Sequence, residues 1–235
     1  NDYIIPAPFD PRLISSVSSA VAKAAMDSGV ARVAIADWQK YEDDLYDRMD
    51  NDNKITRLLH NRAKMNPKRI VFAEADHLDV LKTAQIIHEE GMGIPILLGR
   101  RDVIKELMVE LDFESDVVQI IDPKSDDEKS HLDLYARHFW KERSRKGVTL
   151  YDAQRLMRER NYFAAMMVKL GDADAMLTGY SRAYPTVVKP ILEIIGKLKG
   201  VAKVATCNLM NTSKGPIFIS DTSINIDPTA RELAN

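Results

Sequence analysis

Short runs of apolar residues alternate along this chain with longer stretches in which apolar residues recur at helical spacing. The short runs predict buried strands at residues 69–73, 94–98, 117–121, 175–177, 203–207 and 216–220. The longer stretches predict helices at residues 55–65, 77–90, 102–111, 126–145, 150–170 and 186–197. Strands that alternate with helices favour a mostly parallel sheet with helices on both faces, so the pattern predicts an α/β fold.

Residues 1–50 follow a different pattern from the rest of the chain. They open with an extended apolar segment, NDYIIPAPFD, and continue with helices predicted at residues 11–26 and 38–49. The polar run at residues 50–53 is typical of a linker. The predicted parts are a helical tail over residues 1–50, a main α/β subdomain over residues 51–200 and the start of a second α/β subdomain over residues 201–235.

Composition and charge exclude several classes of protein. The chain has 235 residues, a hydrophobic fraction of 45% and a formal net charge of −2, which together exclude wholesale disorder. The charge gives no general attraction to nucleic acid or to an anionic membrane, and no apolar run is long enough to span a bilayer. The single cysteine, Cys207, excludes an internal disulfide and favours a cytoplasmic protein. Because Cys207 ends an apolar run, we expect its thiol to be buried and inert.

The most informative candidate site is the loop of residues 178–186, which joins a predicted strand to a predicted helix. In parallel sheets ligands bind at the carboxyl ends of the strands, where this loop lies. It contains Thr178, Gly179, Ser181 and Arg182. Free N–H groups at the helix start favour an anion, and an arginine can hold a phosphate with two donors. The alternative is a well-capped loop with a surface arginine.

The strongest local positive charge is the run KERSRK at residues 141–146, at the end of a predicted helix. Cations at a helix end also interact favourably with the helix dipole, so a solvated helix end explains this run without any ligand. The functional alternative is a contact to the phosphates of a nucleotide-like cofactor. Nucleic acid is a weaker alternative, because interleaved aromatic residues and overall basicity are missing.

The sequence predicts no metal site. His131 and His138 are seven residues apart and are more typical of a helix surface than of a metal centre. Asp221, Asn225 and Asp227 follow a predicted strand, but two carboxylates and an amide are better explained by turns and caps.

Several stretches resemble known enzymes. Residues 1–30, with the strings YIIPAPFDPRL and AVAKAAMDSGVA, are similar to the end of the nucleotide-binding domain of bacterial malic enzymes. Residues 68–99, 162–196 and 218–234 resemble phosphotransacetylases. The order of these pieces resembles that of the long, two-module, NADP-dependent malic enzymes of bacteria.

This resemblance implies an enzyme that oxidatively decarboxylates malate to pyruvate and CO2 with NADP and a divalent metal, Mg²⁺ or Mn²⁺. The sites for malate, metal and nicotinamide would lie outside these residues. Residues 1–50 would be the tail of the NAD(P)-binding domain and its linker. Residues 51–200 would be the first subdomain of a phosphotransacetylase-like module, and residues 201–235 the start of its second subdomain. The family's catalytic serine–arginine pair and aspartate belong to a later stretch, so the resemblance places no catalytic residue here.

Two positions correspond to arginines of active phosphotransacetylases. Arg143 matches the arginine of an RxxKG string, whereas Lys189 replaces the arginine of an LRP string. Lysine keeps the charge but loses the planar two-pronged donor. The loop also departs from the transferases, which carry a His-Thr-Thr-like stretch where this chain has residues 182–184, RAY.

These departures count against acetyl transfer, and the resemblance implies a regulatory module that binds acetyl-CoA as an inhibitor. The candidate contacts to acetyl-CoA or phosphate are Arg143, Thr178, Gly179, Ser181, Arg182 and Lys189. An active phosphate acetyltransferase and a purely structural oligomerisation module are the alternatives. In each case the resemblance implies a homo-oligomer.

Overall fold

The computed structural model describes residues 11–47, 54–114, 116, 118–201, 203–212, 215–220, 224–225 and 228–233. The predicted extended segment at residues 1–10, the linker at 50–53, and Asp221 and Asp227 lie outside the described residues. The chain divides into two compact units, one made of residues 1–58 with 205–228 and the other of residues 59–204 with 229–235.

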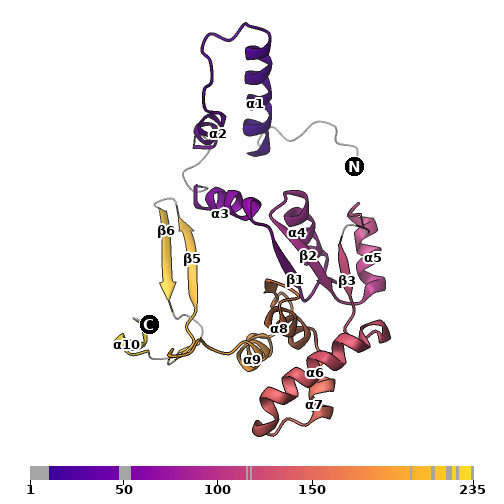
Figure 1. Cartoon of the computed structure of the whole chain (residues 1–235). Helices are drawn as coiled ribbons and strands as arrows, with labels where there is room; N and C mark the ends of the chain where they lie inside the picture. The colour runs from indigo at the N-terminus through magenta and orange to yellow at the C-terminus, as the bar shows by residue number, and fades with distance from the viewer. Residues whose placement is uncertain are drawn as a thin grey trace. The chain divides into compact units, whose positions relative to one another are not determined.

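The larger unit contains a parallel sheet of four strands (Figure 1). The strands are β1 (Lys68–Phe72), β2 (Gly93–Leu98), β3 (Gln119–Ile121) and β4 (Ala175–Leu177). Their order is β3-β2-β1-β4, and β1 pairs with both β2 and β4 in parallel. Since strand β1 lies in the middle, the loop that follows it is next to the loops that follow β2 and β4. The predicted α/β fold is confirmed.

Helices cover both faces of this sheet. Successive residues of each strand point to opposite faces, so each strand contributes side chains to the core on either side. The helices are α4 (Leu78–Glu89), α5 (Arg101–Glu110), α6 (Lys129–Arg143), α7 (Leu150–Met157), α8 (Arg160–Leu170) and α9 (Tyr184–Ile194). Phe72 packs in a buried cluster with Leu81 of α4 and Ile104 of α5. The preceding residue, Val71, packs in a second cluster with residues of α6, α7 and α8 such as Phe139 and Phe163. Both clusters are made of buried apolar residues, and the strand alternation places them on opposite faces.

Most predicted helix boundaries hold to within two residues, but the helix predicted over residues 150–170 is two helices. Helix α7 begins with a capping box, in which the Thr149 hydroxyl accepts the Asp152 N–H at 3.1 Å. The helix ends at Met157, and α8 starts at Arg160 after Glu159 adopts an extended backbone. No glycine or proline interrupts this stretch, so helical spacing did not reveal the break. The break makes Arg160 the first residue of α8.

The strand predicted over residues 203–207 is wrong. The structure instead has β5 (Cys207–Thr212) paired in antiparallel fashion with β6 (Gly215–Ser220), so only the second of the two predicted strands holds. Strand β5 reads CNLMNT, in which polar residues interrupt the apolar ones. The sequence therefore has no apolar run that would predict this strand. Cys207 is exposed, which contradicts the expected buried thiol.

The remaining helices are α1 (Pro11–Asp27), α2 (Trp38–Asp47), α3 (Lys54–Met65) and the short α10 (Ala230–Leu233). Helices α1 and α2 contact each other, and the Lys23 ammonium lies 5.2 Å from the centre of the Trp38 ring. This cation–π contact links the two predicted helices of the N-terminal tail. Among the described residues, no helix is long and apolar enough to cross a membrane.

Candidate functional site

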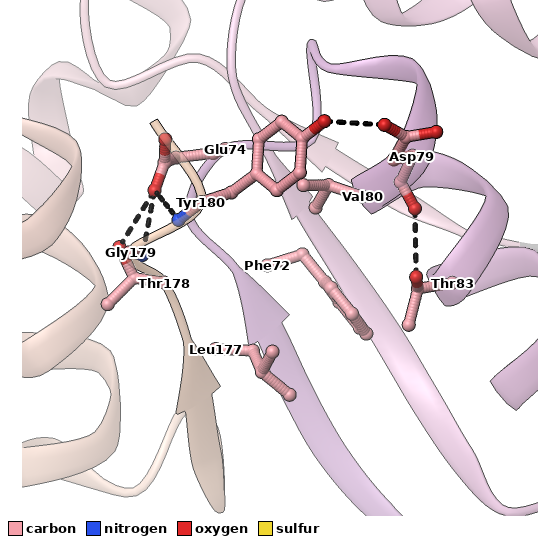
Figure 2. A pocket seen from close by; sticks show the side chains of 9 residues that line it. All are labelled: Phe72, Glu74, Asp79, Val80, Thr83, Leu177, Thr178, Gly179 and Tyr180. Atoms are coloured by element: carbon pink, nitrogen blue, oxygen red, sulfur yellow. Dashed lines mark hydrogen bonds between the residues drawn. The ribbon is translucent and has the colours of Figure 1, made fainter. Parts of the chain in front are cut away.

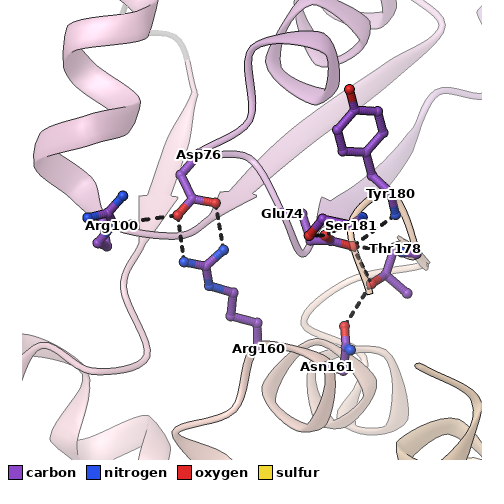
Figure 3. Close-up of polar contacts among 9 residues, drawn as sticks. Glu74, Asp76, Arg100, Arg160, Asn161, Thr178, Tyr180 and Ser181 are labelled. Carbon is purple, nitrogen blue, oxygen red and sulfur yellow. Dashed lines mark hydrogen bonds and ion pairs between the residues drawn. The ribbon is translucent and has the colours of Figure 1, made fainter. Parts of the chain in front are cut away.

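The loop that sequence analysis selected lies at the carboxyl end of β4, and it surrounds a carboxylate of this same chain (Figure 3). Glu74 follows β1 and is only 3% exposed. Its Oε1 accepts the N–H groups of Gly179 at 2.8 Å and Tyr180 at 3.0 Å. Its Oε2 accepts the Ser181 N–H at 2.9 Å and the Ser181 hydroxyl. The loop therefore binds an anion as its composition indicated, but the anion is an internal side chain.

Hydrogen bonding keeps Glu74 charged despite its burial. Burial alone would raise the pKa of this carboxyl group. The hydrogen bonds from the Ser181 hydroxyl and from the three N–H groups outweigh burial, and the pKa of Glu74 is lower than its ordinary value of 4.5. Gly179 has a φ of +101°, a backbone conformation that residues other than glycine rarely adopt. The glycine thus lets consecutive N–H groups turn towards one carboxylate.

The start of helix α9 offers less to an anion than the sequence predicted. Pro185 has no N–H group and lies in the first turn. The N–H groups of Thr186 and Val187 donate to the Ala183 carbonyl at 3.0 and 3.4 Å. The bond of Val187 is the first regular bond of the helix, so two of the four N–H groups that a helix start usually leaves free, those of residues 185 and 186, are absent or engaged here.

Thr178 and Tyr180 extend the loop's contacts to two helices. The Thr178 hydroxyl donates to Oδ1 of Asn161, on α8, at 2.7 Å. The Tyr180 hydroxyl donates to Asp79, in the first turn of α4. Beneath Tyr180 lies a cavity of about 300 Å³ (Figure 2). Its lining is made by Phe72, Glu74, Asp79, Val80, Thr83, Leu177, Thr178, Gly179 and Tyr180. The floor is apolar, with Phe72 and Leu177 on neighbouring strands, and the polar groups stand at the rim.

A second carboxylate, Asp76, lies two residues after Glu74 and is surrounded by arginines (Figure 3). Both of its oxygens accept from the Arg160 guanidinium, at 2.6 Å each. Nε of Arg100, which follows β2, lies 3.7 Å from Oδ2. Burial would raise the pKa of Asp76, but the hydrogen bonds and charge of Arg160 outweigh burial and lower it. Asp76 is therefore a charged, buried residue that fixes the direction of Arg160.

The basic residues expected to bind a ligand do not all meet at the loop. Arg143 ends α6, and its guanidinium lies 3.2 Å from Oε1 of Glu193 on α9. The Tyr162 hydroxyl donates to the other oxygen of Glu193 at 2.7 Å. Burial is the main cause that raises the pKa of Tyr162, and this hydrogen bond raises it further. Arg143 is thus partnered within the fold, although its buried Nε has no hydrogen-bond partner among the described residues.

Arg182 and Lys189 are the two predicted contacts that remain available. Arg182 follows the loop directly, Lys189 lies on α9, and both are exposed. Within the part of the chain that the structure describes, neither residue makes an ion pair. The structure therefore divides the predicted set into Thr178, Gly179 and Ser181, which contact internal partners, Arg143, which pairs with Glu193, and the two free cations.

The strand-end rule also covers the loops at residues 74–77 and 99–101, but sequence reasoning did not select Glu74, Asp76, Arg100 or Arg160 as site residues. The loops that follow β1 and β2 are strand ends, so their charged residues carried the same positional signal as the loop after β4. No local pattern links Glu74 to a loop more than a hundred residues later, or Asp76 to Arg160. Among the described residues, no group of three or more His, Cys, Asp or Glu side chains could hold a metal ion.

Comparisons with known proteins agree with the fold and extend it. The family model of phosphate acetyl/butaryl transferases matches residues 54–235. The NADP-dependent malic enzyme of Rhizobium meliloti is 36% identical over 99% of this chain, but the match covers 30% of that enzyme. The phosphate acetyltransferase of Thermoanaerobacterium thermosaccharolyticum is 32% identical over 77% of this chain and 56% of its own length.

A solved structure shows the same relationship. The phosphotransacetylase from Streptococcus pyogenes superimposes with a TM-score of 0.66 and 31% sequence identity, covering 76% of this chain and 55% of that protein. This chain therefore spans about a third of the malic enzyme and about half of the transferases that it matches. Similarity to malic enzymes extends over the N-terminal helices as well as the α/β unit, which the resemblance of residues 1–30 had predicted.

Proposed function

The chain belongs to the phosphate acetyl/butaryl transferase family, and we propose that it is the phosphotransacetylase-like part of a longer NADP-dependent malic enzyme, where it binds acetyl-CoA as a regulator. The observation that carries this proposal is the extent of the match. Malic enzymes match 99% of the chain, including helices α1 and α2, whereas the phosphate acetyltransferase matches 77%. The whole enzyme would convert malate to pyruvate and CO2 with NADP and Mg²⁺ or Mn²⁺, at sites outside these residues.

The arrangement of charges supports binding rather than acetyl transfer. Arg143, which corresponds to an arginine of active transferases, is paired with Glu193. The N–H groups of Gly179 and Ser181 are occupied by Glu74, so an acyl-CoA phosphate would reach them only by displacing a buried carboxylate. Lys189 stands where the transferases have a second arginine. The two positions that correspond to the transferase arginines, Arg143 and Lys189, therefore do not provide a free pair of positioned arginines for the phosphate of acetyl phosphate.

The proposed contacts to acetyl-CoA are Arg182 and Lys189, since both are exposed cations that form no ion pair with the residues that the structure describes. Thr178, Gly179 and Ser181 would position this loop, and Arg143 would contribute only if Glu193 moved away. Acetyl-CoA would regulate malate oxidation only if it bound two states of the enzyme with different affinities. We place the enzyme in the cytoplasm as a homo-oligomer, in keeping with the family resemblance.

Three assays on the full-length enzyme test this function. Acetyl-CoA should bind in calorimetry and lower the rate of malate oxidation, and thioester formation from CoA and acetyl phosphate should stay at background. Lys189→Gln should weaken acetyl-CoA binding about tenfold, as expected for loss of a charge-assisted contact. Lys82→Gln, which removes an exposed charge from α4, should leave binding unchanged.

Two other outcomes separate the alternatives. Turnover near the ordinary enzyme median of about 10 per second would establish an active phosphate acetyltransferase and overturn the regulatory proposal. Neither turnover nor acetyl-CoA binding, in an enzyme that still oxidises malate, would leave a structural role in subunit assembly.

A further inference from the structure

We propose that Arg100 and Arg160, held around Asp76, form a binding site for a phosphate group at the carboxyl end of β1 and β2. This site is separate from the acetyl-CoA contacts proposed above and does not depend on them. Its residues come from three elements: Asp76 follows β1, Arg100 follows β2, and Arg160 begins α8 (Figure 3). The carboxyl end of a parallel sheet is where such folds bind ligands.

The sheet itself brings these loops together. Beyond the paired strands, the Ala75 N–H donates to the Leu98 carbonyl at 3.1 Å, and the Gly99 N–H donates to the Ile121 carbonyl at 3.1 Å. A side chain built on Gly99 would meet Asp76 at 3.3 Å, so the loop after β2 lies directly against this carboxylate. Arg100 follows Gly99 in sequence, and its Nε lies 3.7 Å from the Asp76 carboxylate.

The contacts of Asp76 involve more guanidinium groups than carboxylates. Arg100 and Arg160 both contact its carboxylate, and one carboxylate neutralises only one of the two guanidinium groups. Arg101 follows as the first residue of α5, and its buried Nε has no hydrogen-bond partner among the residues that the structure describes.

The donors are also pre-oriented. Asp76 has a side chain that is 7% exposed and holds both terminal nitrogens of Arg160 at 2.6 Å, which fixes the plane of that guanidinium. Arg100 directs only its Nε towards Asp76, and its side chain is 63% exposed. Its terminal nitrogens are therefore open to solvent. A phosphate group suits this arrangement because its several oxygens accept bonds from planar, two-pronged donors.

The contrast with Arg143 makes the assignment specific. Arg143 and Glu193 form a pair with one charge of each sign, and their side chains are 19% and 21% exposed. A phosphate at Arg143 would first have to displace Glu193. At Asp76 the excess cation is exposed and needs no displacement.

The first test measures binding of inorganic phosphate to the full chain by calorimetry, at an ionic strength held constant with sodium chloride. Phosphate should bind with a saturable isotherm, and Arg100→Gln should weaken binding at least about tenfold, because it removes an exposed charge-assisted donor. Lys105→Gln is the matched control, since Lys105 is an exposed cation one turn later on the same helix. It should bind phosphate like the unmodified chain.

A second arm identifies where the phosphate comes from. CoA is titrated in the presence of saturating inorganic phosphate, and competition would show that the site takes a phosphate carried by CoA. Binding of phosphate without competition would identify free phosphate as the ligand, and either result supports the site. The proposal is overturned if Arg100→Gln binds phosphate as tightly as Lys105→Gln does. It is also overturned if the heat of titration depends on ionic strength and does not saturate as the phosphate concentration rises. Loss of acetyl-CoA binding in the earlier assays would leave this result unaffected.

Discussion

Glu74 and Asp76 lie two residues apart on one loop, and the fold uses their charges in opposite ways (Figure 3). Glu74 is surrounded by neutral donors, three N–H groups and a hydroxyl, all from the loop after β4. Asp76 is surrounded by guanidinium groups from two other elements. The loop after β4 is thus occupied by an internal anion, whereas two guanidinium groups contact the single carboxylate of Asp76.

This difference shows why composition alone does not reveal whether an anion-binding loop is open to a ligand. A loop with a glycine and hydroxyl residues is a good anion-binding loop, and this one does bind an anion. The question that composition cannot answer is whether the anion is supplied by the chain. Here the side chain that supplies it is more than a hundred residues earlier in the sequence.

The largest effect is expected when the neutral environment is broken. Glu74→Gln replaces one acceptor oxygen with an NH2 group that faces N–H donors, leaving buried donors unpaired. We expect a loss of about 3 kcal/mol in the free energy of unfolding, measured by urea denaturation. Glu106→Gln, an exposed change on α5, should cost less than about 0.5 kcal/mol. Equal stabilities for these two variants would contradict the role assigned to Glu74.

A smaller loss is expected at the charged environment. Asp76→Asn removes the partner of Arg160 and leaves the arginines to repel one another. Because the Arg160 side chain is 23% exposed and solvent compensates part of the loss, we expect about 2 kcal/mol by the same measurement. Added phosphate should restore part of this stability if the site binds an anion. Asp102→Asn is the control, and it should change the free energy of unfolding little.

Thr178 tests the comparison further because its hydroxyl contacts both Asn161 of α8 and the Glu74 carboxylate. Its hydroxyl donates to Asn161 at 2.7 Å and lies 3.4 Å from Glu74. Thr178→Val keeps the shape and removes this bond, so we expect a loss of about 1 kcal/mol in thermal or urea unfolding. Thr83→Val is the matched variant, since the Thr83 hydroxyl bonds only within its own helix, to Asp79. A loss of the same size at Thr83 would mean that the Asn161 bond has no special weight.

The mildest perturbation is acidification. The folded-state pKa of Glu74 is lower than its ordinary value of 4.5, so above that value the group contributes its full stability. As pH falls below about 4.5, the unfolded chain takes up the proton first, and stability declines until the folded-state pKa is passed. Glu74→Gln should show a shallower decline over this range in urea unfolding at successive pH values. Parallel profiles would indicate that other carboxyl groups control the acid response.

The sequence was sufficient for those features that neighbouring residues determine. The apolar run at residues 69–73 predicted a buried strand, and helical spacing from residue 150 predicted the start of α7. The break between α7 and α8 and the antiparallel β5 were missed, because neither has a local signal such as glycine, proline or an apolar run. The candidate site was half predicted: the loop after β4 was found, but its carboxylate partner was not.

The most direct test of the contrast between Glu74 and Asp76 is a phosphate titration of the full chain followed by NMR, with backbone amides and arginine Nε–H groups assigned. The structure predicts saturable shifts of the Arg100 and Arg160 Nε–H signals and of the backbone amides of Arg100 and Arg101, while the amides of Gly179, Tyr180 and Ser181 stay unchanged. Shifts that begin at Gly179, Tyr180 and Ser181, with Arg100 unaffected, would show that phosphate displaces Glu74 and would contradict the account.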